Sequence, residues 1–107
     1  MLARARAARV DLALVAARLR EATRIELNRA HAEVIVGRAW LIGSLAWGEY
    51  GAGSDVDVVV EGVSPQGIDE LWARLSRTLG ERLDLLRLEE LPPSFRARVL
   101  SEGIAIA

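Results

Sequence analysis

The stretch that decides the fold is Gly43–Val60, which reads GSLAWGEYGAGSDVDVVV. It opens with Gly-Ser and, ten residues later, reaches Asp55-Val56-Asp57 and a run of valines. We predict a strand over residues 55–62, in which alternation places Asp55 and Asp57 on one face. Two carboxylates on one strand face repel each other and raise each other's pKa, so we expect a cation between them.

A third carboxylate follows in the next predicted strand, over residues 82–88. Asp84 is flanked by leucines that we expect to face the core, so its side chain points the other way. If the two strands are neighbours, Asp84 meets Asp55 and Asp57 on one surface. The chain has no cysteine, and oxygen ligands alone favour Mg²⁺ or Mn²⁺ over zinc. Asp84 would help to hold one metal and activate an attacking hydroxyl.

The Gly43-Ser44 pair is a candidate phosphate-binding turn. Glycine lets a phosphate approach the backbone, and the start of a short helix offers free N–H groups. We expect Ser44 both to cap that helix and to contact phosphate. Ser54 is either a turn residue or a phosphate ligand. Two metals holding a triphosphate would stabilise attack on the α-phosphate and the charge on the departing pyrophosphate.

The rest of the chain supplies helices around these strands. Residues 1–36 contain no glycine or proline, which favours one long helix, although AEVIVG could finish it or begin a strand. Its predicted apolar face consists of Ala8, Leu12, Val15, Leu19, Ala22 and Ile25. Further elements are expected at 38–43 (strand), 44–50 (short helix), 64–80 (helix) and 92–103 (helix). This order predicts an α/β sheet packed by helices.

Four aromatic positions have predicted environments. Trp40 and Trp72 are expected in the core. Trp47 lies, with Tyr50, in a short exposed element, where nucleotide stacking or a partner contact competes with packing.

Composition narrows the function classes. The chain has 107 residues, a net charge of −1 and fourteen basic residues that are all arginine, which excludes a catalytic lysine. Its apolar runs are shorter than the ~18–20 residues that span a bilayer, so we expect a cytoplasmic protein. The chain has an acidic middle, with no arginine over residues 39–73, which disfavours a nucleic-acid partner. A chain this short buries a modest core, so a homo- or hetero-oligomer would help it.

The combined pattern of Gly43-Ser44, ten residues, Asp55-Val56-Asp57 and a later Asp84 resembles the nucleotidyltransferase fold shared with polymerase beta. The ending LDLLRLEELPPSFRARVLSEGIAIA resembles its minimal form, the minimal nucleotidyltransferase (MNT) family. The resemblance implies a small mixed sheet packed by helices, with ATP as substrate and Mg²⁺ as cofactor. We expect one domain over 1–107, with an N-terminal helix (1–32) and a catalytic core (33–107).

The resemblance also implies a partner. Members of the MNT family often serve as antitoxins of a HEPN-domain toxin, an RNase, which they adenylylate on a tyrosine. This implies transfer of AMP from ATP to a protein hydroxyl. The alternatives are an antitoxin that acts by binding alone, and transfer to RNA, which would need a basic groove. Many relatives carry an arginine where this chain has Trp47, which leaves most phosphate neutralisation to metal.

Overall fold

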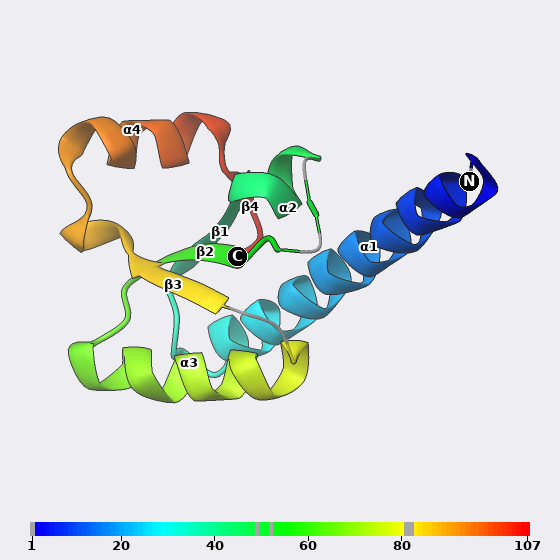
Figure 1. Cartoon of the computed structure of the whole chain (residues 1–107). Coiled ribbons are helices and arrows are strands. Elements are labelled where there is room, and N and C mark those ends of the chain that lie inside the picture. Colours follow the sequence, from blue (N-terminus) through cyan, green and yellow to red (C-terminus); the bar gives the residue numbers. More distant parts are fainter. Residues whose placement is uncertain (1, 49, 52, 81–82) are drawn as a thin grey trace.

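The computed structural model describes residues 2–48, 50–51, 53–80 and 83–107, with side chains from residue 11 onward. Helices and strands alternate along it, as the sequence predicts (Figure 1). The elements are α1 (Leu2–Ala32), β1 (Arg38–Ile42), α2 (Gly43–Trp47), β2 (Val56–Glu61), α3 (Pro65–Leu79), β3 (Leu83–Arg87), the 3₁₀ turn η1 (Leu88–Glu90), α4 (Pro93–Glu102) and β4 (Ile104–Ala105). Among the described residues, no helix is both long and apolar enough to cross a bilayer.

The strands form one mixed sheet in the order β3-β2-β1-β4. Strand β2 runs antiparallel to β1 and parallel to β3, and the short β4 pairs antiparallel with β1. The mixed α/β sheet is therefore confirmed. The sequence prediction ended with a helix at 92–103 and did not include β4, which is only two residues long.

Helix α3 is the crossover that a parallel pair of strands requires. The Oγ of Ser64 accepts a hydrogen bond from the Gly67 N–H at 2.9 Å, so it caps the helix, and Gly80 ends it at φ 63°. The helix buries Leu71, Leu75 and Leu79. Trp72 is 50% exposed, so its predicted place in the core is wrong. It lies one position after Leu71, and the buried row of α3, which packs on α1 and the sheet, does not include it.

The two faces of the sheet are covered by different helices. Valines 56, 58 and 60 of β2 pack with buried residues of α1 and α3. Val59 points the other way and packs with Trp40, Leu88 and Val99, which come from β1, η1 and α4. The core position of Trp40 is thus confirmed. In Figure 1, α3 lies on one side of the strands and α4 on the other.

Helix α1 is confirmed, but its buried face differs from the predicted one. Val15 and Ile25 are exposed, and of the predicted stripe Leu19 is buried, whereas Ala22 is only partly so. Among the side chains of α1 that the structure describes, from residue 11 onward, the buried face consists of Ala16, Leu19, Thr23, Glu26, Leu27 and Ala30. The side chain of Ala8, also predicted in this stripe, lies outside the described part. The helix ends at Ala32, the first residue of AEVIVG, and is followed by a turn with Val34 at φ 59°. AEVIVG therefore finishes the helix and does not begin a strand.

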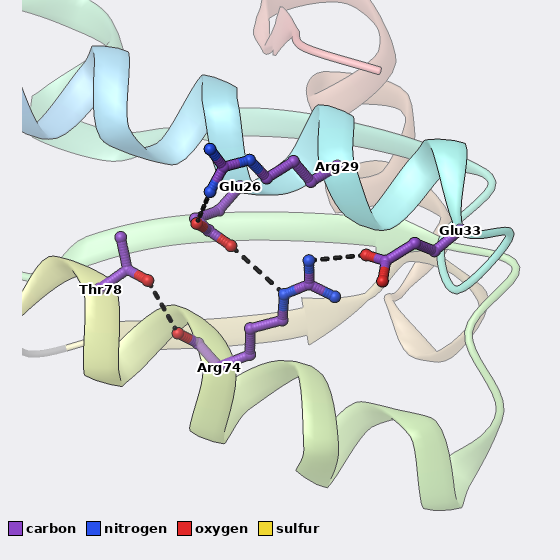
Figure 2. Close-up of polar contacts among 5 residues, drawn as sticks. All are labelled: Glu26, Arg29, Glu33, Arg74 and Thr78. Atoms are coloured by element: carbon purple, nitrogen blue, oxygen red, sulfur yellow. Dashed lines mark hydrogen bonds and ion pairs between the residues drawn. The ribbon is translucent and has the colours of Figure 1, made fainter.

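A network of charges fixes α1 against α3 (Figure 2). Glu26, which is buried, contacts Arg29 at 3.0 Å and Arg74 of α3 at 3.3 Å. Arg74 also reaches Glu33 at 2.6 Å. Burying a carboxylate is costly unless it is paired, so Arg74 is what permits Glu26 to lie inside this helix contact.

Replacing Arg74 by methionine should therefore destabilise the protein by about 1–2 kcal/mol, because Glu26 keeps only Arg29 as its partner. Arg77, an exposed residue of the same helix, offers the matched control, and Arg77→Met should change stability by less than about 0.5 kcal/mol. Urea unfolding of both variants measures the difference. Equal stabilities would show that the network contributes nothing to the α1–α3 contact.

Candidate functional site

Three residues form a row across the sheet. Asp57 of β2 lies opposite Ile42 of β1 on one side and opposite Asp84 of β3 on the other. The two strands that carry the aspartates are neighbours, as the sequence argument required. Directly opposite residues of adjacent strands point to the same face, so both carboxylates lie on the face that α4 covers.

A pocket of about 230 Å³ opens beside this row. It is bounded by the sheet, by the start of α2 and by α4. Its lining residues are Ile42, Gly43, Trp47, Asp57, Asp84, Leu86, Phe95, Arg98 and Val99. The pocket therefore combines two carboxylates and one guanidinium with an apolar wall, the usual composition of a site for a small organic ligand.

The electrostatics single out Asp57. Partial burial raises its pKa above the ordinary value, and the negative charges of Asp84 and Asp55 raise it further. Asp57 is thus a carboxylate whose ionised form is disfavoured until a cation arrives. Such a perturbed group in a pocket is a candidate functional residue.

Asp55 has a different place from its two companions. It lies directly before β2, is half buried, and does not line the pocket, although its charge acts on Asp57. In the described part of the chain, no three carboxylate or histidine side chains gather closely enough to hold a metal ion by themselves. The pair of Asp57 and Asp84 still fits Mg²⁺, which usually binds one or two carboxylates and completes its shell with water and substrate phosphate.

Gly43 brings the two halves of the motif into contact. Its backbone has φ 72°, a conformation that favours glycine, and a Cβ at this position would collide with the carboxylate of Asp57. Glycine is therefore required twice, for the turn from β1 into α2 and for the close approach to Asp57. This close approach places the turn from β1 into α2 beside the carboxylate of Asp57.

Comparison with known proteins follows this geometry. The family model described as "Polymerase beta, Nucleotidyltransferase" matches residues 25–107. The chain belongs to the polymerase beta nucleotidyltransferase family. No curated protein matches it significantly.

Among solved structures, a minimal nucleotidyltransferase is 30% identical, with a TM-score of 0.67 over 87% of this chain and 93% of that one. A toxin–antitoxin structure with AMP-PNP is 19% identical, with a TM-score of 0.66 over 78% of this chain and 72% of that one. A mutant of the MntA–HpeT toxin–antitoxin is 17% identical, with a TM-score of 0.66 over 78% of this chain and 72% of that one. The last two likenesses establish the shared fold.

The serines of this nucleotidyltransferase differ from their predicted roles in one respect. Helix α2 begins after Ile42 and has no side-chain cap, so the predicted capping by Ser44 is wrong. Ser44 is already the second residue of the helix, and its contact with phosphate stays a prediction. The Oγ of Ser54 accepts a hydrogen bond from the Gly51 N–H at 3.0 Å, which gives Ser54 the turn role that we had left open.

Sequence reasoning missed Arg98. The aspartate-bearing segment has no arginine, but α4 folds over the sheet and brings Arg98 into the pocket. Its guanidinium lies 5.2 Å from the centre of the Trp47 ring, and the Trp47 indole N–H donates to the Glu102 carbonyl at 3.0 Å. Trp47 is 43% exposed and is tied to α4, so packing accounts for part of its surface. Little in the sequence around residue 98 points to this position.

Proposed function

We propose that this nucleotidyltransferase is metal-dependent and transfers AMP from ATP to a hydroxyl of a HEPN-type toxin, acting as its antitoxin in the cytoplasm. The observation that carries the proposal is the contact of Gly43 with Asp57 in a row with Asp84. Gly43, which belongs to the proposed phosphate-binding turn, and the two carboxylates line one pocket there. The relative described as a minimal nucleotidyltransferase and the toxin–antitoxin structure with AMP-PNP support this choice of substrate and partner.

In this proposal each residue of the site has a stated task, and Asp84 has two. Asp57 and Asp84 hold Mg²⁺ or Mn²⁺, with Asp55 adding negative charge beside them. The metal, when bound, neutralises the triphosphate and stabilises the departing pyrophosphate. Gly43 and Ser44 offer backbone N–H groups, and Ser44 also its hydroxyl, to the phosphates. The whole chain, 1–107, works as one domain, with residues 1–32 available for docking.

Asp84 is proposed as the base of the reaction. The acceptor oxygen bonds to the α-phosphorus, the bond from that phosphorus to the bridging oxygen breaks, and pyrophosphate leaves. The acceptor's proton passes to the carboxylate of Asp84. Asp84 suits this task because it is exposed at the edge strand β3, where an acceptor can reach it.

The direct test is to mix the chain with its toxin, ATP and Mg²⁺ and to measure the intact mass of the toxin. We expect the addition of AMP, on a tyrosine first. Wild-type protein that neutralises the toxin without ever adding AMP would contradict the proposal.

Replacing Asp84 by asparagine should slow the chemical step more than it weakens ATP binding, because a base acts only when the hydroxyl reacts. General-base catalysis contributes about 10²–10⁴-fold, so we expect kcat to fall by roughly that factor. Measurement of kcat for AMP transfer beside the Kd of Mg·ATP separates the two effects. If kcat and the affinity for Mg·ATP fall by the same factor, Asp84 acts as a metal ligand and not as a base.

The second candidate is an antitoxin that acts by contact alone. It is favoured by the finding that, among the described residues, no three carboxylate or histidine side chains group together as a metal site. Under this alternative, Asp57→Asn would neutralise the toxin at full strength, and no AMP would appear on the toxin with wild-type protein. The mass measurement and a growth assay with the variant therefore separate the two candidates.

A further inference from the structure

Arg98 is the cation of the pocket. Of the residues that line it, Asp57 and Asp84 carry negative charge and Arg98 carries positive charge. The two aspartates come from the sheet, whereas Arg98 comes from α4, which covers this face. Phe95 and Val99 of the same helix also line the pocket, so this face of α4 is part of the site.

The guanidinium of Arg98 is held in place by contacts that leave some of its hydrogen-bond donors available. Its Nε donates to the carboxylate of Glu102 at 2.8 Å, and its Cζ lies over the Trp47 ring. In the described part of the chain, this is the hydrogen bond that Arg98 makes, so its two terminal nitrogens keep their donors. Trp47 donates to the Glu102 carbonyl, so the stacked ring is itself fixed to α4.

Arg98 is not paired with the aspartates of the pocket. Its ion-pair partner is Glu102, one helical turn away on α4. Its side chain is 60% exposed, so such a pair on a helix surface contributes little to stability. Its place in the pocket, with the guanidinium over the Trp47 ring, is more than such a pair requires.

We propose that Arg98 binds the phosphate oxygens of the nucleoside triphosphate from the α4 side of the pocket and stabilises the charge that develops on pyrophosphate. This deepens the proposed function and rests on it. Phosphate charge would then be neutralised from both sides, by the metal on the carboxylates and by Arg98 on α4. A guanidinium suits this task because its planar fork matches phosphate oxygens and stacks on aromatic rings.

The test compares Arg98→Met and Arg98→Lys with the control Arg77→Met, which removes an exposed arginine of α3 outside this pocket. The Kd of Mg·ATP is measured by calorimetry on the full chain, and kcat and KM by AMP transfer to the toxin. For Arg98→Met we expect kcat to fall about 100-fold and the Kd to rise about tenfold. Arg98→Lys should recover part of the loss, because it keeps the charge but loses the fork.

The outcomes separate this inference from the function on which it rests. If wild type transfers AMP and Arg98→Met transfers it at the same rate, the proposed role of Arg98 is wrong and the proposed enzymatic function stands. If wild type binds Mg·ATP but transfers no AMP, and Arg98→Met loses that binding, then Arg98 is confirmed as a phosphate ligand. The proposed enzymatic function is then wrong. Wild type that does not bind Mg·ATP overturns both. Circular dichroism and thermal unfolding establish that each variant is folded.

Discussion

Replacing Asp57 by asparagine is expected to lower the rate of AMP transfer by about 10³-fold or more. Asp57 is the carboxylate that touches Gly43 and lies opposite Asp84, so the metal and the phosphate turn both depend on it. Metal stabilisation of the transition state is worth several kcal/mol, and each 1.4 kcal/mol is about tenfold in rate. Transfer is measured by intact mass of the toxin over time. Full Mg²⁺-dependent activity of this variant would show that the carboxylate assignment is wrong.

The same substitution should leave the metal-free protein as stable as wild type or slightly more stable at neutral pH. Burial and the charges of Asp84 and Asp55 raise the pKa of Asp57 in the folded state. Its contribution to stability is therefore full below the unfolded pKa, near ~3.9, and is lost as pH rises through the folded pKa. Asparagine does not ionise, so the Asp57→Asn variant does not lose this stability as the pH rises. Thermal unfolding between pH 4 and 8 should show a smaller decline with pH for the variant.

Magnesium supplies a second readout of this substitution. If Asp57 and Asp84 hold the ion, Mg²⁺ should raise the Tm of wild type and have little effect on Asp57→Asn. Asp69→Asn is the matched control, since it removes the same charge from an exposed position of α3. Equal responses of the two variants to Mg²⁺ would locate the ion elsewhere.

Replacing Gly43 by alanine is expected to be the most damaging single-methyl change in the site. An alanine at φ 72° costs about 1–2 kcal/mol in backbone energy, and its Cβ would displace the carboxylate of Asp57. A displacement of about 1 Å in a catalytic group can cost roughly 10²-fold in rate. We therefore expect both a lower free energy of unfolding and a loss of transfer of about that size.

Gly48 separates these two effects. It has φ 86°, and a Cβ there would meet no atom within 4 Å. Gly48→Ala should therefore show the backbone cost in urea unfolding but keep wild-type transfer. If both glycine variants lose transfer equally, backbone strain and not the contact with Asp57 explains the loss.

Much of the fold followed from local patterns. The valine run, the alternation around Asp57, and the serine and glycine that bound α3 are signals within a few residues, and each was confirmed. Each of these signals depends on neighbours in sequence. The adjacency of Asp57 and Asp84 was only a condition of the sequence argument, and the structure meets it because α3 joins β2 and β3 as a parallel pair.

What could not be predicted depends on tertiary contacts. The phase of α1 was wrong because its many alanines give little contrast between faces, and because Arg74 allows Glu26 to be buried. Trp72 is apolar but lies beside the buried row of α3. Arg98 lies fourteen residues after Asp84 and enters the pocket only because α4 folds back across the sheet.

The contact between Gly43 and Asp57 also restricts the order in which these positions can change during evolution. While the carboxylate of Asp57 is present, any residue with a Cβ at position 43 meets it. A lineage that gave up catalysis would thus have to shorten residue 57 before it could replace Gly43. Reconstructed ancestors should show that order, with glycine outlasting the aspartate it once accommodated, and the reverse order would indicate that the contact imposes no such constraint.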